Sequence, residues 1–191
     1  MLDFRKLLAR AWAVLPAAAL VAALPAASLA SPRLDSPYLD VPYVQQVKAG
    51  CGSAAVAMVI EYWAARFPAL NTVASDTEKI DRLLPASSKG IQGSALKQYL
   101  ESRGFSAFTF NAEWSDLAHH FEKGRPVIVC LAPKGPRAPL HYAVVVGVDP
   151  QNVWLNDSAR GKLFREDRQR FLEEWKFTGN WALLAVPRLD Q

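Results

Sequence analysis

The feature that most constrains the fold is an almost unbroken apolar segment, CGSAAVAMVIEYW, at residues 51–63. A helix that is apolar on every side is stable only when other elements surround it. We therefore predict a helix that begins at Cys51 and runs through the middle of a domain. Gly52 and Ser53, which follow the cysteine, are small and leave its thiol accessible.

Cys51 is a candidate nucleophile because of its place at the start of this helix. The backbone N–H groups there carry a partial positive charge, which favours the thiolate over the thiol. The second cysteine, Cys130, lies in the apolar run RPVIVCLAP, a predicted central strand in which a free cysteine behaves as a small hydrophobe. The alternative is a disulfide between Cys51 and Cys130, which an oxidising compartment permits.

His141 is the candidate base among the three histidines. His119 and His120 lie in WSDLAHHFEKG, whose apolar spacing predicts a short amphipathic helix with both imidazoles in solvent. His141 instead opens the strand-like run HYAVVVGV, and the next run, NVWLN, leads directly to Asp157. A thiol, an imidazole and a carboxylate in this arrangement are typical of cysteine hydrolases. The alternatives are a core histidine at the start of a strand and a turn aspartate that binds nearby backbone N–H groups.

A donor for the tetrahedral oxyanion completes an acyl-transfer site. Gln45 stands six residues before Cys51 and can supply a side-chain N–H beside the backbone N–H of Cys51. Gln46 takes this role if the register is shifted by one residue.

These segments together resemble the C39 peptidases, the papain-like family that includes the double-glycine leader peptidases. The resemblance covers residues 38–187, and it rests on the segments VPYVQQ, CG with its apolar helix, GIQGSALKQYLESRGF, KGRPVIVCLAP, HYAVVVGV, WLNDSARG and FLEEW. It implies Gln45 as oxyanion donor, Cys51 as nucleophile, His141 as general base and acid, and Asp157 as the group that orients His141. One departure is Ser158, because the family usually has proline directly after the aspartate.

The order of the predicted elements indicates an α+β fold. Helices are expected from Cys51 to about residue 67, over 76–84 and over 94–103, and strands follow from Phe105 onward, with the 114–123 helix inserted among them. Such segregation gives separate layers. It agrees with the papain-like fold that the resemblance implies, with an N-terminal helical part and a C-terminal antiparallel sheet.

The N-terminal part of the chain has the pattern of a secretory signal. MLDFRKLLAR is basic, AWAVLPAAALVAALPAA is apolar, and SLA at residues 28–30 offers small residues for cleavage. We predict a signal peptide at 1–30, a flexible lead-in at 31–37 and one peptidase domain at 38–187. The protein is then secreted or periplasmic; the alternative is an N-terminal membrane anchor.

The predicted function is a thiol-dependent peptidase that acts on a peptide or protein substrate as a monomer and without a cofactor. The alternatives are a cell-envelope amidase or transpeptidase, and a binding or maturation module without activity. The net charge of +4 comes with no basic stripe that interleaves with aromatics, which argues against nucleic-acid binding. GIQG lacks the ending of a phosphate loop, and no cysteine pair has the spacing of metal ligands.

Overall fold

The computed structural model describes residues 37–47, 50–73, 75–84, 86–87, 90–135 and 137–188. The predicted signal segment at 1–30 and most of the predicted lead-in lie outside these residues. Among the helices that the structure describes, none is both long and apolar enough to cross a membrane.

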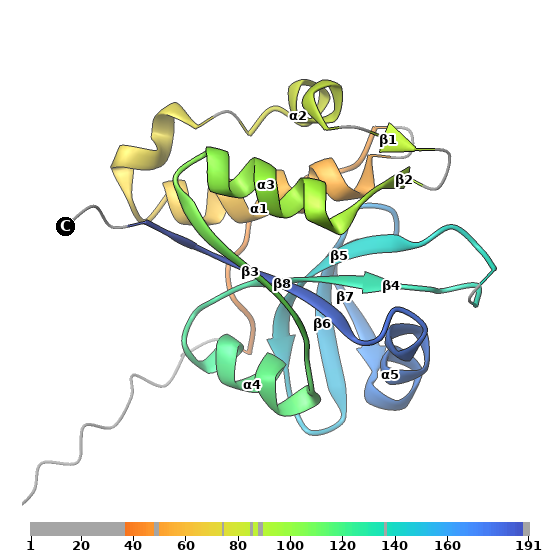
Figure 1. The fold of residues 1–191 in the computed structure, drawn as a ribbon. Coiled ribbons are helices and arrows are strands. Elements are labelled where there is room, and N and C mark those ends of the chain that lie inside the picture. The colour runs from red at the N-terminus through yellow and green to blue at the C-terminus, as the bar shows by residue number, and fades with distance from the viewer. Residues whose placement is uncertain are drawn as a thin grey trace, which may run out of the picture. The chain divides into compact units, whose positions relative to one another are not determined.

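The first half of the described chain is mainly helical, as the sequence predicts (Figure 1). In chain order it contains helix α1 (Cys51–Ala64), the 3-10 helix η1 (Pro68–Thr72), helix α2 (Thr77–Leu83), the short strands β1 (Ala86–Ser87) and β2 (Gly90–Ile91), and helix α3 (Gly93–Ser102).

The second half forms an antiparallel sheet of six strands in the order β3-β8-β4-β5-β6-β7. The strands are β3 (Phe105–Asn111), β4 (Val127–Leu131), β5 (His141–Val148), β6 (Asn152–Asp157), β7 (Gly161–Asp167) and β8 (Trp181–Pro187). Helices α4 (Trp114–Glu122) and α5 (Arg168–Lys176) lie on the face of the sheet opposite α1 and α3 (Figure 1).

Helix α1 lies in the larger of two apolar clusters, between the sheet and the other helices. Every residue from Gly52 to Ile60 is buried, which confirms the predicted central helix. The packing around position 52 is tight, because a Cβ there would lie 3.1 Å from Leu96 Cδ2 and 3.4 Å from Tyr142 Cδ2. The start of α1 is therefore held firmly against α3 and β5.

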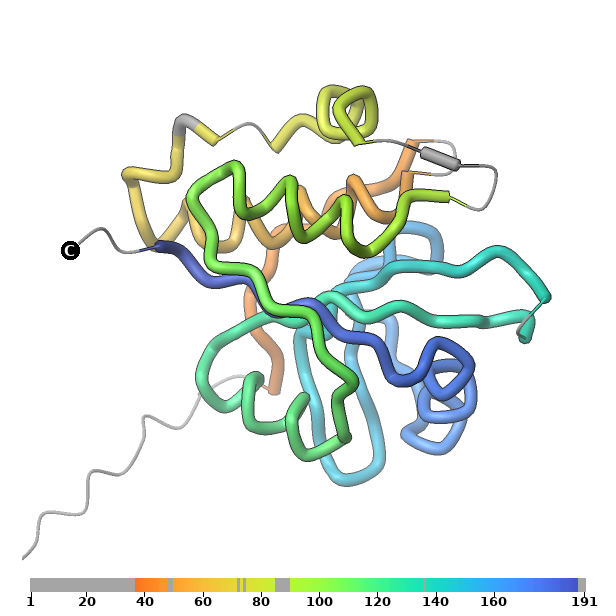
Figure 2. The backbone as a smooth tube through the Cα atoms, in the orientation of Figure 1, coloured from red at the N-terminus to blue at the C-terminus, as the bar shows by residue number. Residues whose placement is uncertain are grey.

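The entry segment, residues 37–47, connects the sheet to α1. Leu39 N–H donates to the Val146 carbonyl of β5 at 2.6 Å, and the Asn156 side chain donates to the Val41 carbonyl at 2.8 Å. Figure 2 shows this segment, in orange, running past the sheet toward α1. These contacts fix the path of the chain just before Cys51.

Candidate active site

Cys51 is the first residue of α1, as predicted, and its thiol is partly buried. Gly50 precedes it as the N-cap and makes no side-chain cap hydrogen bond. Burial opposes ionisation of the thiol, but hydrogen bonds from His141 and from the backbone N–H groups of Tyr142 and Gly52 outweigh it. The pKa of Cys51 is therefore lower than that of an ordinary cysteine.

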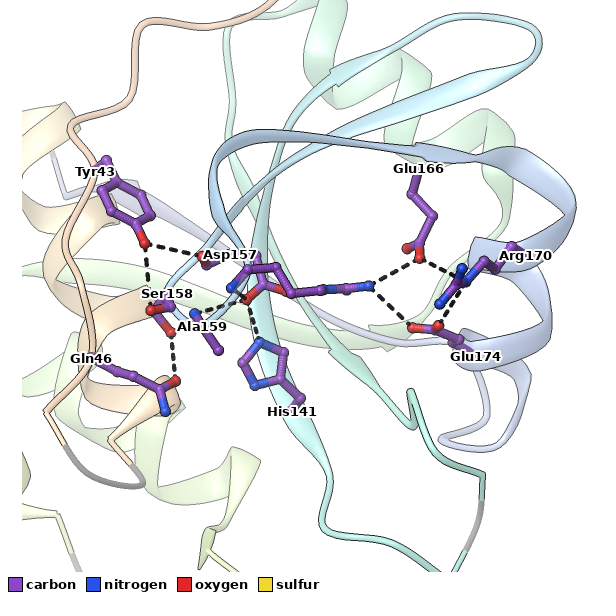
Figure 3. Close-up of polar contacts among 10 residues, drawn as sticks. Tyr43, Gln46, His141, Asp157, Ser158, Ala159, Glu166, Arg170 and Glu174 are labelled. Atoms are coloured by element: carbon purple, nitrogen blue, oxygen red, sulfur yellow. Dashed lines mark hydrogen bonds and ion pairs between the residues drawn. The ribbon is translucent and has the colours of Figure 1, made fainter.

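His141 and Asp157 meet because their strands are antiparallel neighbours. His141 begins β5 and Asp157 ends β6, so both stand at the same end of the sheet. His141 Nε2 lies 2.8 Å from Asp157 Oδ1 (Figure 3). The other ring nitrogen, Nδ1, is then the one available for the hydrogen bond between His141 and Cys51.

The charge on His141 is stabilised from both sides. Burial disfavours the imidazolium, but hydrogen bonds and charge from Asp157 and Cys51 raise the pKa of His141 to about 9. The lowered pKa of Cys51 and the raised pKa of His141 both favour the pair of thiolate and imidazolium. A cysteine nucleophile requires this ionised pair.

Asp157 is completely buried and accepts several hydrogen bonds. Its Oδ1 accepts from the backbone N–H groups of Ala159 and Arg160, each at 2.9 Å, and its Oδ2 accepts from Arg160 Nε at 2.6 Å. Burial alone would raise the pKa of Asp157, but His141, Arg160 and the Ala159 N–H hold it well below its usual range. Asp157 thus makes the backbone contacts of a turn aspartate and also the contact with His141 that an orienting carboxylate needs.

The structure differs from the sequence prediction at the glutamine. Gln45 is exposed, whereas Gln46 lines the cleft beside Cys51. The Ser158 hydroxyl donates to Gln46 Oε1 at 2.9 Å, and the Gln46 N–H donates to the Ser158 carbonyl at 3.4 Å (Figure 3). The Gly50 N–H donates to the Val47 carbonyl between the glutamines and Cys51, so a count along an extended chain does not decide which glutamine faces the cleft.

A cleft of about 410 Å³ opens beside the Cys51 and His141 side chains. Its walls come from the entry segment, the β4–β5 loop and the turn after β6. The lining residues are Gln46, Cys51, Pro133, Lys134, Pro139, Leu140, His141, Ala159 and Arg160. Pro133, Pro139 and Leu140 make the loop wall largely apolar, and Leu140 is 45% exposed.

The remaining candidate residues lie apart from this cleft. Cys130 is buried and free, and so is not bridged to Cys51; burial raises the pKa of its thiol to about 12. His119 and His120 stand on α4, on the other face of the sheet. Across the described ranges, no group of three or more His, Cys, Asp and Glu side chains could hold a metal ion.

Known proteins resemble this chain over most of its length. The model of the Peptidase_C39 like family matches residues 38–183. The lactococcin-G-processing and transport ATP-binding protein LagD of Lactococcus lactis subsp. lactis is 27% identical over 137 residues, which cover 69% of this chain. This chain spans only 17% of the length of LagD.

Solved structures with a similar fold are also peptidases. A double glycine motif protease from an AMS/PCAT transporter, in complex with the leader peptide, has a TM-score of 0.61 at 21% identity and covers 81% of this chain and 96% of its own. A C39-like peptidase from Bacillus anthracis has a TM-score of 0.60 at 18% identity, over 80% of this chain and 99% of its own. At these identities the likeness concerns the fold.

Proposed function

The chain belongs to the Peptidase_C39 like family of cysteine peptidases, with the α+β, papain-like fold that the sequence predicts, and we propose that it cleaves peptide bonds through Cys51, His141 and Asp157. The observation that carries the proposal is the linked set of contacts at one end of the sheet. Cys51 shares a hydrogen bond with His141, whose Nε2 lies 2.8 Å from Asp157 Oδ1.

Cys51 acts as the nucleophile in this proposal. Its thiolate attacks the carbonyl carbon of the substrate and forms a tetrahedral intermediate with a negatively charged oxygen. His141, protonated on both nitrogens, gives a proton to the leaving amine, and the amine departs from the acyl-enzyme. Water then attacks the thioester while His141 takes its proton, and the thiolate is released. Asp157 keeps the imidazole in the required orientation throughout.

Gln46 is the side-chain donor to the oxyanion in this proposal, together with the backbone N–H of Cys51. The support is its place in the cleft beside the thiol, which Gln45 does not share. Ser158 binds the oxygen end of the Gln46 amide, so the nitrogen end lies on the opposite side of the group (Figure 3). An amide held in this way is preorganised to donate.

The substrate is a peptide or a protein, and the residues that line the cleft determine which substrate sequences bind. The double glycine motif protease was solved in complex with the leader peptide. The largely apolar loop wall here, formed by Pro133, Pro139 and Leu140, suits an apolar side chain of the substrate close to the scissile bond.

The deciding experiment is the digestion of a peptide library by the wild-type protein and by the Cys51→Ala variant. The proposal predicts defined cleavage products from the wild type and none from the variant. An added amine separates hydrolysis from acyl transfer, because a transpeptidase would join the amine to the new carboxyl end. Equal products from both proteins would refute the role of Cys51.

We also propose that the protein is exported, on the basis of the basic and apolar segments within residues 1–30, and, as a separate proposal, that it is a monomer. Fractionation of producing cells and N-terminal sequencing test this. A mature N-terminus near residue 31 supports export with cleavage. An intact N-terminus in the membrane fraction supports the anchor instead, and light scattering of the purified protein measures its oligomeric state.

A further inference from the structure

Arg160 connects Asp157 to two buried glutamates that the reaction does not use. Its Nε lies 2.6 Å from Asp157 Oδ2, and its Nη1 lies 3.0 Å from Glu166 Oε1 and 3.7 Å from Glu174 Oε2. Figure 3 shows Glu166 and Glu174 at the end of this network opposite His141. The guanidinium is therefore fixed between the candidate active site and the β7–α5 region.

The contacts on Asp157 divide between its two oxygens. Oδ1 receives His141 and two backbone N–H groups, whereas the side chain of Arg160 approaches Oδ2. A planar guanidinium on Oδ2 fixes the rotation of the carboxylate about its own axis. This rotation decides whether Oδ1 faces His141 Nε2.

Arg160 also compensates part of the negative charge of this cluster. The side chains of Asp157, Glu166 and Glu174 are 0%, 2% and 8% exposed, and Arg160 is 21% exposed. Arg170 adds a second guanidinium, 3.4 Å from both glutamates, but it is 68% exposed. Without Arg160, three neighbouring carboxylates in a buried region would be left with less compensation, and such groups take up protons more readily.

We propose that Arg160 is a positioning residue of the active site, held in place by Glu166 and Glu174, which keeps Asp157 ionised and directed at His141. The inference deepens the proposed peptidase function and rests on it. The other titratable groups around Asp157 are Tyr43, whose hydroxyl donates to the Asp157 carbonyl at 3.3 Å, and Cys51 beyond His141.

The test compares Arg160→Gln and Arg160→Lys with Arg165→Gln as the matched control. Arg165 is exposed on the same strand, β7, that carries Glu166, and it does not contact Asp157 in the network described. For each protein, kcat and KM are measured on a cleaved peptide. The rate of Cys51 alkylation by iodoacetamide is measured against pH, which reports on the thiolate without any peptide substrate.

For Arg160→Gln we expect kcat to fall about 10- to 100-fold with KM within about twofold, because a displacement of about 1 Å can cost about 10²-fold in rate. The acid limb of the alkylation profile, which is the rise in alkylation rate as the Cys51 thiol ionises, moves to higher pH. The reason is that Asp157 and Cys51 both lose a nearby positive charge. Arg160→Lys retains the charge but cannot bridge Asp157 and Glu166, so its acid limb stays in place while kcat falls. Arg165→Gln leaves both quantities unchanged.

A folded Arg160→Gln protein with wild-type kcat and a wild-type acid limb would overturn the inference. A lower melting temperature with both readouts unchanged would do the same, because it assigns Arg160 a structural role alone. If Arg160→Gln does not fold, Arg160→Lys decides, and wild-type kcat in that variant refutes the role. Failure of the peptidase proposal itself looks different, because the wild type then cleaves no peptide.

Discussion

Substitution of the two adjacent glutamines gives opposite results if the register seen in the structure is right. Gln46 lines the cleft with its Oε1 held by Ser158, whereas Gln45 is exposed. Loss of one oxyanion donor costs about 10²- to 10³-fold in kcat, or about 2.7–4 kcal/mol of transition-state stabilisation. We expect this loss in Gln46→Ala and a nearly unchanged kcat in Gln45→Ala, which is the matched control.

A substitution of Ser158 measures how much of the loss in kcat comes from the orientation of the Gln46 amide. Ser158→Ala keeps the Gln46 amide but removes the hydrogen bond that orients it. A neutral hydrogen bond of this kind contributes about 0.5–1.5 kcal/mol, so we expect kcat to fall about 2- to 10-fold. The effect of Ser158→Ala disappears in a Gln46→Ala background, because the two residues act through one amide.

The assay measures kcat and KM on a cleaved peptide, together with the rate of Cys51 alkylation. Alkylation stays close to wild type in both glutamine variants, because the thiolate depends on His141 and on backbone N–H groups. A large loss in Gln45→Ala with none in Gln46→Ala would refute the register. No loss in either variant would refute a side-chain oxyanion donor in this enzyme.

Three further predictions concern pH, Cys130 and the cleft wall. The raised pKa of His141 means that the imidazolium is present below about pH 9 and is lost above it. Above about pH 9 we therefore expect peptide turnover to fall while alkylation of the Cys51 thiolate continues. A parallel loss of turnover and alkylation would contradict this. Cys130→Ala should keep the wild-type kcat and lower the free energy of unfolding, measured by urea denaturation, by about 1 kcal/mol. Loss of activity in a folded Cys130→Ala protein would instead give Cys130 a catalytic role. Leu140→Asp is expected to lower kcat/KM for peptides with an apolar side chain at the scissile bond. Leu83→Asp is the control, because Leu83 is similarly exposed but lies outside the cleft, and it should leave kcat/KM unchanged. Equal effects of the two substitutions would show that Leu140 does not select the substrate.

The parts of the fold that the sequence predicts are those set by local pattern. The helix at Cys51 follows from apolar residues on every side, and the strand at His141 follows from a run of β-branched residues bounded by a loop. Strand β7 and helix α5 were not predicted. Leu163 has a positive φ of 53° within β7, and α5 is mostly charged, with Phe171 and Trp175 as its large fully buried side chains.

The parts of the candidate site that the sequence leaves open, or does not indicate, depend on tertiary contacts. Gln46 is only an alternative to Gln45 in the sequence, and its place in the cleft is accompanied by a hydrogen bond from Ser158, which lies 112 residues away in the chain. The role proposed for Arg160 depends on Glu166 and Glu174, which contact it from β7 and α5. The one sequence signal was Ser158 itself, which stands where the resemblance leads one to expect proline.

The turn after β6 joins both halves of the proposed mechanism. Asp157 contacts His141, and the next residue, Ser158, contacts Gln46, so adjacent residues hold the proposed proton carrier and the proposed oxyanion donor. Tyr43 reinforces this link from the entry segment, because its hydroxyl contacts the carbonyls of both residues at 3.3 and 3.5 Å. A displacement of the turn therefore disturbs proton transfer and oxyanion binding together. The resemblance leads one to expect proline at position 158, and a proline there would have no hydroxyl to donate to Gln46, whereas Ser158 has one.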